Sequence, residues 1–235
     1  MTRIQTWISG LGILLVILVL SATIGVPAEA APAPTDSTTP YPTVLFQIGD
    51  LTEQEIADLL WMREEEKLAR DVYLTLADRW NLRVFTNISR SEQQHMDTML
   101  SLINAYGLED PVGDNPQGVF TNTELQALHD QLVAQGKRSQ IEALKVGATI
   151  EEVDIVDLEQ SISDTDNTDV NQAYYHLMCG SENHLRAFVR NLAQRGETYT
   201  PQYLDQARYD EIIAGTTGSC GPQLTYKTYI AFLLP

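Results

Sequence analysis

The sequence predicts an all-α fold, a four-helix bundle with a long crossover between the second and the third helices. Apolar residues recur at three- and four-residue spacing along four long segments, as on the buried face of a helix. The alternation of apolar and polar residues that is typical of a strand is nearly absent. The connection after the second segment is long for a hairpin, but it suits two helices that run parallel.

Composition divides the chain of 235 residues into four parts. Residues 1–30 are expected to be a signal peptide, and residues 31–50 a linker rich in Pro and Thr. Residues 51–196 are expected to form the helical bundle, which is long enough to bury an apolar core of its own. Residues 197–235 form a C-terminal extension with no predicted role.

The N-terminal segment has the features of a secretory signal. Arg3 precedes an apolar run over residues 8–26, and Ala28-Glu29-Ala30 is the small-x-small pattern that signal peptidase reads. The apolar run is also close to the ~18 residues that a membrane-spanning helix needs, so an uncleaved anchor is the alternative. Either way we expect the rest of the chain to work outside the cytoplasm, in contact with a membrane only if the segment is not cleaved.

The net charge of −17 restricts the partners of the protein. Residues 1–30 contain one Arg and one Glu, so their removal leaves this charge unchanged. Such a charge disfavours binding to nucleic acid and to anionic membrane surfaces, and it favours cations. Simple solubility is the more ordinary explanation of the charge alone. We expect no nucleic acid as a partner and leave a homodimer open, while the residues described below predict metal ions as partners.

The first predicted helix has sequence signals at both ends. Thr52 and Glu55, three residues apart, match a capping box at its start. An apolar face then continues to Trp80, and Asn81 ends the helix.

The second predicted helix covers about residues 88–106. Asn87 or Ser89 is its expected N-cap, and Gly107 is its stop. The crossover that follows contains turn signals and a short predicted helix over about 123–135.

The last two predicted helices lead into the C-terminal extension. They span about 139–162 and 170–195, and Gly196 ends the second of them. Cys179 and Cys220 are the two cysteines of the chain. In an oxidising compartment we expect them to form one disulfide.

The second helix carries two polar residues in the middle of its apolar face. Glu92 and His95 form an E-x-x-H pair, and positions three apart share one face, so both side chains point inward with Met99. A buried carboxylate without a partner costs several kcal/mol, and a metal ion removes that cost. E-x-x-H on a bundle helix is the arrangement of di-iron sites. The alternative is a buried Glu–His hydrogen-bonded pair.

The first helix offers three consecutive acids, Glu64, Glu65 and Glu66. From the direction of the apolar residues, Glu65 lies nearest the centre of the inward face, Glu66 at its edge, and Glu64 faces water. Glu66 also opens the pattern E-x-x-A-x-x-x-Y that ends at Tyr73, which resembles the first-helix metal motif of ferritin-like proteins. We select Glu66 as a ligand, with Glu65 in reserve. A solvated charge run, shared with Lys67 and Arg70, is the expectation for one or two of the three acids.

Acids also interrupt the apolar face of the third helix. Glu151 and Glu152 stand side by side in it, and Asp154 follows three residues after Glu151. Approximate symmetry between the first and third helices of ferritin-like bundles favours Glu151 as a ligand. Glu152 and Asp154 are reserves, and a solvated helix face is the alternative.

The fourth helix places His184 in phase with its apolar face, which makes it the fifth candidate ligand. Three residues earlier, where a second E-x-x-H would have its Glu, the sequence has Ser181. Glu182 points about 200° away from His184 around the helix, where it can pair with Arg186. Water, another acid or a rebuilt helix turn that brings in Glu182 could fill this position, and a single-metal site is also open.

The chain from about residue 51 to 196 resembles the ferritin-like superfamily. Its phrases MREEEKLARDVY, SEQQHMDTM, IEEVDIVDL and GSENHLRAFVRNL are closest to an uncharacterised ferritin-like family of prokaryotes, known as a domain of unknown function. The resemblance implies two metal ions, expected to be iron, with manganese or a single metal open.

Roles within the site follow from the same resemblance. It implies bridging roles for Glu92 and Glu151, and terminal roles for Glu66, His95 and His184. Tyr73 and Tyr106 are expected to lie near the metals, where they could act as electron relays or simply belong to the core.

The expected function is an exported di-iron oxidoreductase that acts on ferrous iron, oxygen or peroxide. The absence of a CxxC pair excludes the self-contained electron path of a rubrerythrin. The alternative is a metal-binding or interaction module with an incomplete site that catalyses nothing, which the serine at position 181 favours.

Overall fold

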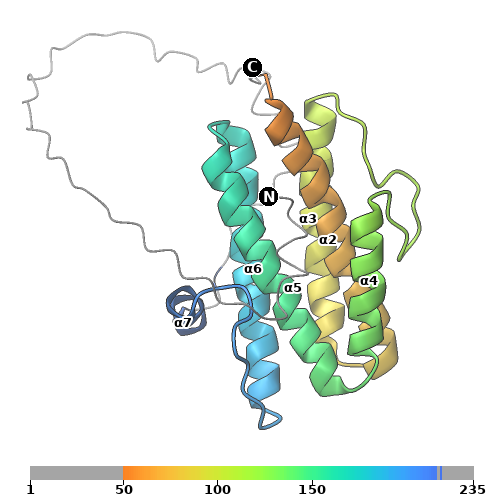
Figure 1. The fold of residues 1–235 in the computed structure, drawn as a ribbon, viewed down its shortest axis with the longest axis vertical. Helices are drawn as coiled ribbons and strands as arrows, with labels where there is room; N and C mark the ends of the chain where they lie inside the picture. Colours follow the sequence, from red (N-terminus) through yellow and green to blue (C-terminus); the bar gives the residue numbers. More distant parts are fainter. Residues whose placement is uncertain (1–49, 216–217, 219–235) are drawn as a thin grey trace, which may run out of the picture.

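The computed structural model describes residues 50–215 and residue 218, and this part of the chain has an all-helical fold without a strand (Figure 1). Its six helices are α2 (Glu53–Trp80), α3 (Arg83–Ala105), α4 (Thr123–Gly136), α5 (Gln140–Asp164), α6 (Thr168–Ala193) and α7 (Gln206–Ala214). The predicted all-α class is confirmed. None of these helices has both the length and the apolar character that crossing a membrane requires. The predicted signal peptide, most of the linker, and Cys220 lie outside the described residues.

Four long helices lie side by side (Figure 1). Two residues separate α2 from α3 and three separate α5 from α6, so each pair is antiparallel and closely packed. The crossover after α3 runs along the outside of the molecule and carries α4, which packs on α2 and α5. Because of this crossover, α5 runs in the same direction as α3.

The predicted helix ends agree closely with the structure in most places. Thr52 Oγ1 accepts the backbone N–H of Glu55 at 3.2 Å, and Glu55 Oε2 accepts that of Thr52 at 2.7 Å, which completes the capping box. Asn81 ends α2 in the left-handed conformation, with φ 50°. The start of α3 is the exception, because that helix begins at Arg83.

The predicted caps of α3, Asn87 and Ser89, are wrong. Ser89 lies inside the helix and donates its hydroxyl proton to Thr86 O at 3.1 Å. The left-handed turn at Asn81 reverses the chain at once, so α3 can start early and bury the side chain of Phe85 completely. Burial of an aromatic ring outweighs the absence of a side-chain cap at Leu82.

Charged residues of α2 that were expected to face water are covered by the crossover. Glu64 is buried and accepts backbone N–H groups of Thr121 at 2.6 Å and Asn122 at 3.0 Å. Lys67 is fully buried, pairs with Asp71 and donates to a crossover carbonyl at 2.8 Å. The solvated-face prediction is therefore wrong here, because the crossover supplies partners that the pattern of one helix does not reveal.

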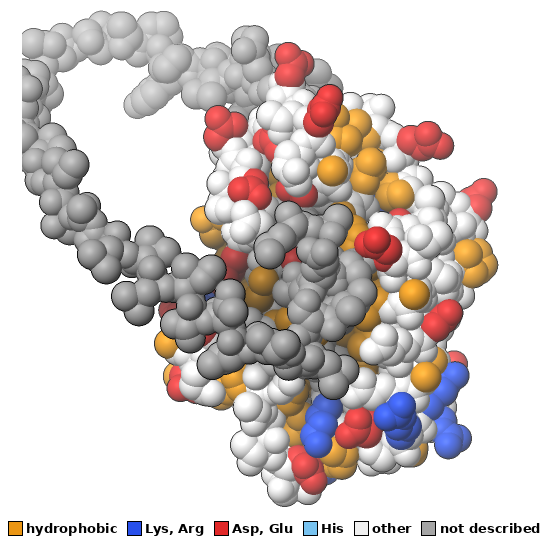
Figure 2. All heavy atoms as spheres, in the orientation of Figure 1, with side chains coloured by type: hydrophobic (Ala, Val, Ile, Leu, Met, Phe, Trp, Pro, Cys, Tyr) orange, Lys and Arg blue, Asp and Glu red, His pale blue; other side chains and the backbone are white. Residues whose placement is uncertain are grey.

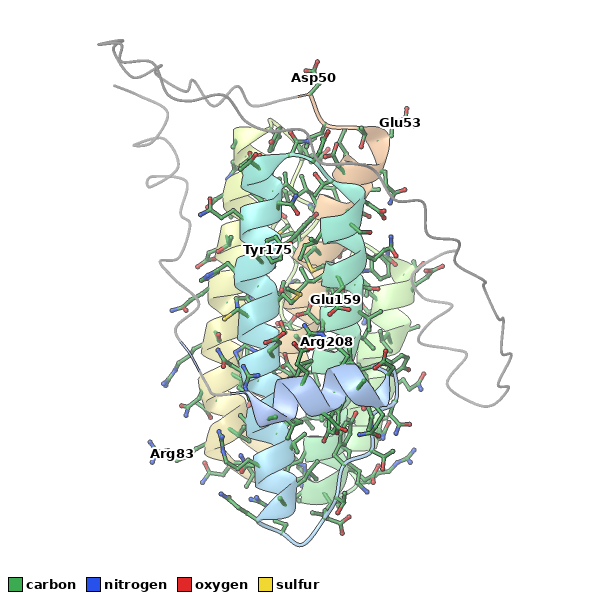
Figure 3. All side chains as sticks on the ribbon, turned by 90° about the vertical axis from the view of Figure 1, so that its left-hand side faces the viewer. Asp50, Glu53, Arg83, Glu159, Tyr175 and Arg208 are labelled. Atoms are coloured by element: carbon green, nitrogen blue, oxygen red, sulfur yellow. The ribbon has the colours of Figure 1, made fainter. Side chains whose placement is uncertain are left out.

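The described residues 197–215 of the C-terminal extension cover the outer side of α5 and α6. Helix α7 crosses these two helices, and Figure 3 shows Arg208 of α7 beside Glu159 of α5. Arg208 pairs with Glu159 at 2.8 Å and with Glu182 of α6 at 2.6 Å. In the segment before α7, the backbone N–H groups of residues 202–204 all donate to Glu152 Oε2, at 2.7 to 3.0 Å.

A layer of polar side chains divides the apolar core into two clusters. One cluster includes Phe85 and Phe188, and the other includes Met62 and Met99. On each of the four long helices, buried acids or imidazoles stand between residues of the first cluster and residues of the second. The four helices therefore place these polar groups at one level inside the molecule.

The carboxylate of Glu55 ties the start of α2 to the turn between α5 and α6. It accepts hydrogen bonds from Thr165, from Asn167 at 2.6 Å and from the Thr52 backbone. Burial acts to raise the pKa of Glu55, but these donors prevail and lower it to about 2. Because this pKa lies below the unfolded value, the bonds stabilise the fold above pH 4.5, and the effect disappears as pH falls toward 2.

We expect Glu55→Gln to lower the free energy of unfolding by about 2 to 3 kcal/mol at pH 7, and by progressively less as pH falls from 4.5 toward 2. Urea unfolding across this pH range measures the difference from wild type. Glu53→Gln, an exposed change in the same helical turn, is the control and should cost only a few tenths of a kcal/mol. A difference for Glu55→Gln that stayed constant with pH would contradict the role of its charge.

Candidate metal centre

Five side chains of the polar layer meet between the four long helices. They are Glu66 from α2, Glu92 and His95 from α3, Glu151 from α5 and His184 from α6, and all five are buried. Each of these residues is in phase with the apolar residues of its helix, and this periodicity determines which face of the helix turns inward. The structure thus brings together every residue that the sequence selected first.

The five residues form two groups that share Glu92. In the first, His95 Nδ1 lies 3.2 Å from Glu66 Oε2 and 2.9 Å from Glu92 Oε2. In the second, His184 Nδ1 lies 2.9 Å from Glu92 Oε1 and 3.3 Å from Glu151 Oε2. Within each group the potential ligand atoms all lie within 4.8 Å of one another, so each group could hold a metal ion. Glu92 has one oxygen in each group and could therefore contact both ions.

Several potential metal-ligand atoms of the polar layer form no hydrogen bond. Within the described part of the chain, Glu66 Oε1, Glu92 Oε1 and His184 Nδ1 are buried and lack a hydrogen-bond partner. Glu92 Oε1 and His184 Nδ1 are close, yet their directions do not suit a hydrogen bond. Buried polar atoms are normally satisfied, so atoms left this way fit a cation that they would bind together.

Neighbouring groups hold the ligands in position. Tyr73 donates its hydroxyl proton to Glu151 Oε1 at 2.6 Å, and His184 Nε2 lies 2.9 Å from the hydroxyl of Ser91. The rings of His95 and His184 stack with their centroids 5.5 Å apart. A Cβ at Gly180 would lie 2.4 Å from His95 Nε2, so the ring needs a glycine at this point of α6.

The electrostatics of the layer follow from burying five titratable groups together. Burial, with the charge of Glu92, raises the pKa of Glu66 and of Glu151 to about 7. Burial also acts to raise the pKa of Glu92, but the two imidazoles prevail and it lies far below its ordinary value. Burial disfavours charged imidazole, yet the carboxylates raise the pKa of His184 to about 10 and that of His95 well above its ordinary value. A bound metal ion would take the place of these imidazole protons.

Two of the four reserve residues lie away from the centre. Glu152 is occupied by the backbone of residues 202–204, and Glu182 pairs outward with Arg208 and with Arg186 at 3.7 Å. On each helix the preceding residue, Glu151 or Ser181, points inward instead, because successive residues are about 100° apart around the helix axis.

The other two reserves, Glu65 and Asp154, are buried beside the centre. Glu65 Oε2 accepts the indole N–H of Trp61 at 3.0 Å, and Asp154 accepts the hydroxyl proton of Ser181. Neither belongs to the two groups of ligand atoms. Tyr106 lies at the far end of α3 and donates to Asp169 at 2.7 Å, so the expectation that it lies near the metals is wrong.

Sequence reasoning missed the two residues that orient the imidazoles. Gly180 carried a signal, because a glycine inside a long helix often marks a close approach of another group. Ser91 carried none, since a serine beside an acid on a helix is common. Its contact with His184 depends on how α3 packs against α6.

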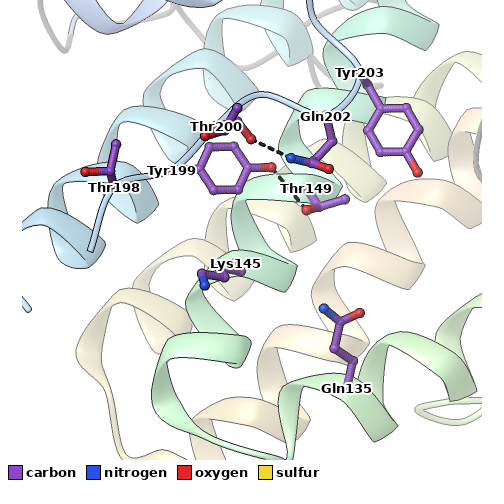
Figure 4. Close-up of a pocket in the computed structure, with 8 residues that line it drawn as sticks. All are labelled: Gln135, Lys145, Thr149, Thr198, Tyr199, Thr200, Gln202 and Tyr203. Atoms are coloured by element: carbon purple, nitrogen blue, oxygen red, sulfur yellow. Dashed lines mark hydrogen bonds between the residues drawn. The ribbon is translucent and has the colours of Figure 1, made fainter. Parts of the chain in front are cut away.

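A separate cleft of about 400 Å³ lies between α5 and the segment after α6 (Figure 4). It is lined by Gln135, Lys145, Thr149, Thr198, Tyr199, Thr200, Gln202 and Tyr203. The hydroxyls of Thr149 and Tyr199 lie 3.1 Å apart, and Gln202 donates to Thr200 O at 2.7 Å. The described residues that line it include no carboxylate and no imidazole, so the cleft does not belong to the metal centre.

The family model described as "Uncharacterized protein domain (DUF2202)" matches residues 55–216, which include the whole candidate centre. The chain belongs to the DUF2202 family. Another relative is the uncharacterized protein MJ0754 of Methanocaldococcus jannaschii, which is 52% identical over 167 residues, 71% of this chain and 90% of that protein. The crystal structure of hypothetical protein MJ0754 aligns with a TM-score of 0.72 at 50% identity, covering 73% of this chain and 98% of that one. This relative supports the fold, and its printed names assign it no activity.

We expect Gly180→Ala to displace the ring of His95, because the added methyl group would occupy the space of Nε2. The free energy of unfolding should fall by about 1 to 2 kcal/mol, the cost of overpacking less the gain in helix propensity. Imidazole ¹H–¹⁵N spectra should show shifted His95 signals. Gly136→Ala is the matched control, since its Cβ would lie 2.7 Å from Leu76 and away from the centre. Unchanged His95 signals in Gly180→Ala would contradict the close approach.

Proposed function

We propose that this DUF2202 protein is an exported, ferritin-like protein that holds two metal ions. The metal we expect is iron, and the protein uses the two ions in oxidation–reduction chemistry. The observation that carries the proposal is the pair of buried carboxylate–histidine groups that share Glu92. Their oxygen and imidazole donors suit divalent iron or manganese.

The arrangement of the helices supports a ferritin-like bundle. All four long helices contribute a candidate ligand, and the crossover makes α3 and α5 parallel. In di-iron carboxylate bundles, ligands project inward from facing helices in this way. The acidic surface also supports cation binding, since Figure 2 shows Asp and Glu spread over the upper part of one face and Lys and Arg toward its lower edge.

When bound, two iron ions would supply electrons to oxygen or peroxide, or take electrons from further ferrous iron. The protein supplies the coordination and a dry environment. Glu92 would contact both ions, with Glu66 and His95 on one side and Glu151 and His184 on the other. The apolar clusters above and below the layer limit the access of water.

Other groups near the centre would set ligand orientation. The hydroxyl of Tyr73 holds Glu151, and the hydroxyl of Ser91 holds the outer nitrogen of His184. Such outer contacts fix the ring and the carboxylate before metal binds.

Export is the second part of the proposal, and it rests on the N-terminal residues. The apolar run with the Ala28-Glu29-Ala30 pattern favours release outside the cytoplasm. In that location the expected partners are metal ions, while a nucleic acid partner is disfavoured by the charge of −17.

A metal-binding module without turnover is the second candidate. The observation that favours it is the serine at position 181, which leaves α6 with an imidazole and without the carboxylate that accompanies the imidazole of α3. Such a site would stabilise the fold with metal but would not oxidise a substrate.

We expect the mature protein to carry about two iron ions per chain after anaerobic loading with ferrous iron, because two ligand groups are present. Elemental analysis measures this content. Glu92→Ala and His95→Ala should lose most of the metal while circular dichroism shows an intact fold. Asp97→Asn, an exposed change on the same helix, is the control. Full metal content in both alanine variants would overturn the site.

The loaded protein should consume oxygen or peroxide faster than free ferrous iron at the same concentration, since an oxidoreductase needs a redox metal with an open position. An oxygen electrode and a peroxide assay measure the rates. A protein that gains thermal stability with iron and shows no excess consumption would be a binding module, and the oxidoreductase proposal would be wrong.

A further inference from the structure

Helices α3 and α6 contribute unequally to the candidate centre. Each presents one imidazole to Glu92, His95 from α3 and His184 from α6. Three residues before its imidazole, α3 has the carboxylate of Glu92, whereas α6 has the hydroxyl of Ser181. Ser181 is fully buried, so the position still faces the interior.

A carboxylate from another helix lies at this position. Asp154 of α5 is buried, and its Oδ2 accepts the hydroxyl proton of Ser181. It follows Glu151 by three residues, so both acids lie on the same face of α5. It also lies within electrostatic range of Glu66, a ligand of the first group. Asp154 is therefore close enough to interact with candidate ligands of both α2 and α5.

The second oxygen of Asp154 has no partner. Among the described residues, no donor forms a hydrogen bond with Asp154 Oδ1, although the atom is buried. Ser181 Oγ lies 3.1 Å from Leu177 O and is thereby fixed against its own helix. The carboxylate is therefore held by one oxygen while the other is free to bind a cation.

We propose that Asp154 is the fourth carboxylate ligand of the metal pair and that Ser181 positions it, so that α5 supplies the acid that α6 lacks. This inference rests on the proposed function, because it adds a ligand to the same two ions. The inference also gives Ser181 a role. Its hydroxyl group stands where a carboxylate of α6 would be, and it holds the carboxylate of Asp154 from α5 there.

Charge balance supports a fourth carboxylate. Glu66, Glu92 and Glu151 bring three negative charges, whereas two divalent ions bring four positive ones. An unbalanced charge in a buried site is costly, and Asp154 supplies the missing negative charge. Glu65 is the other buried acid nearby, but it takes its hydrogen bond from Trp61 of its own helix, whereas Ser181 holds Asp154 at the position of α6 that lacks a carboxylate.

The test compares metal binding in Asp154→Asn with that of the wild type. The change keeps the shape of the side chain and removes its charge, so the metal-free fold should be preserved, as circular dichroism would show. We expect metal content to fall from about two ions toward one, or affinity for Mn²⁺ in anaerobic calorimetry to fall at least tenfold. Asp157→Asn, one turn further along α5 and also buried, is the matched control. It should keep the metal content and the Mn²⁺ affinity of the wild type.

Ser181→Ala separates positioning from ligation. It leaves the charge of Asp154 but removes the group that holds it, so we expect a severalfold loss of Mn²⁺ affinity. Unchanged metal content and affinity in both Asp154→Asn and Ser181→Ala would overturn the inference, even though Glu92→Ala loses its metal. A wild-type protein without bound metal would instead overturn the proposed function itself.

Discussion

Glu92 is the residue on which the polar layer depends. Its two oxygens contact the imidazole of its own helix and that of α6, each at 2.9 Å, so one carboxylate joins α3 to α6 at the centre of the molecule. A buried carboxylate is tolerated only with partners of this kind. The remaining acids of the layer are arranged around this contact, and the two apolar clusters pack on either side of it.

The sequence was sufficient for most of the fold. Apolar periodicity predicted the four long helices, and the capping box at Thr52 and the turn at Asn81 placed both ends of the first. The start of α3 was wrong because it depends on the burial of Phe85, a contact between helices. Periodicity describes one helix at a time, so it cannot show what a neighbouring segment covers.

The same limit explains which parts of the centre were predicted. Glu92 and His95 stood out because polar residues interrupted an otherwise apolar face. The selection of Glu66 over Glu65, which agrees with the group of potential ligand atoms in the structure, needed the resemblance to ferritin-like proteins, since helix phase alone favoured Glu65. The partnership of Asp154 with Ser181 joins residues of two helices that are 27 positions apart, and no local pattern encodes it.

Glu151 and Glu152 connect the candidate centre with the outside of the protein. The two acids are adjacent, so they point in directions about 100° apart, one toward the centre and one toward the extension. Three backbone N–H groups of the extension donate hydrogen bonds to Glu152. These bonds fix the face of α5 that turns outward, while the adjacent Glu151 points toward the centre from the same turn of the helix. The segment after α6 is therefore coupled to the candidate centre through α5, so a sequence change in that segment can alter the centre without replacing any of its five side chains.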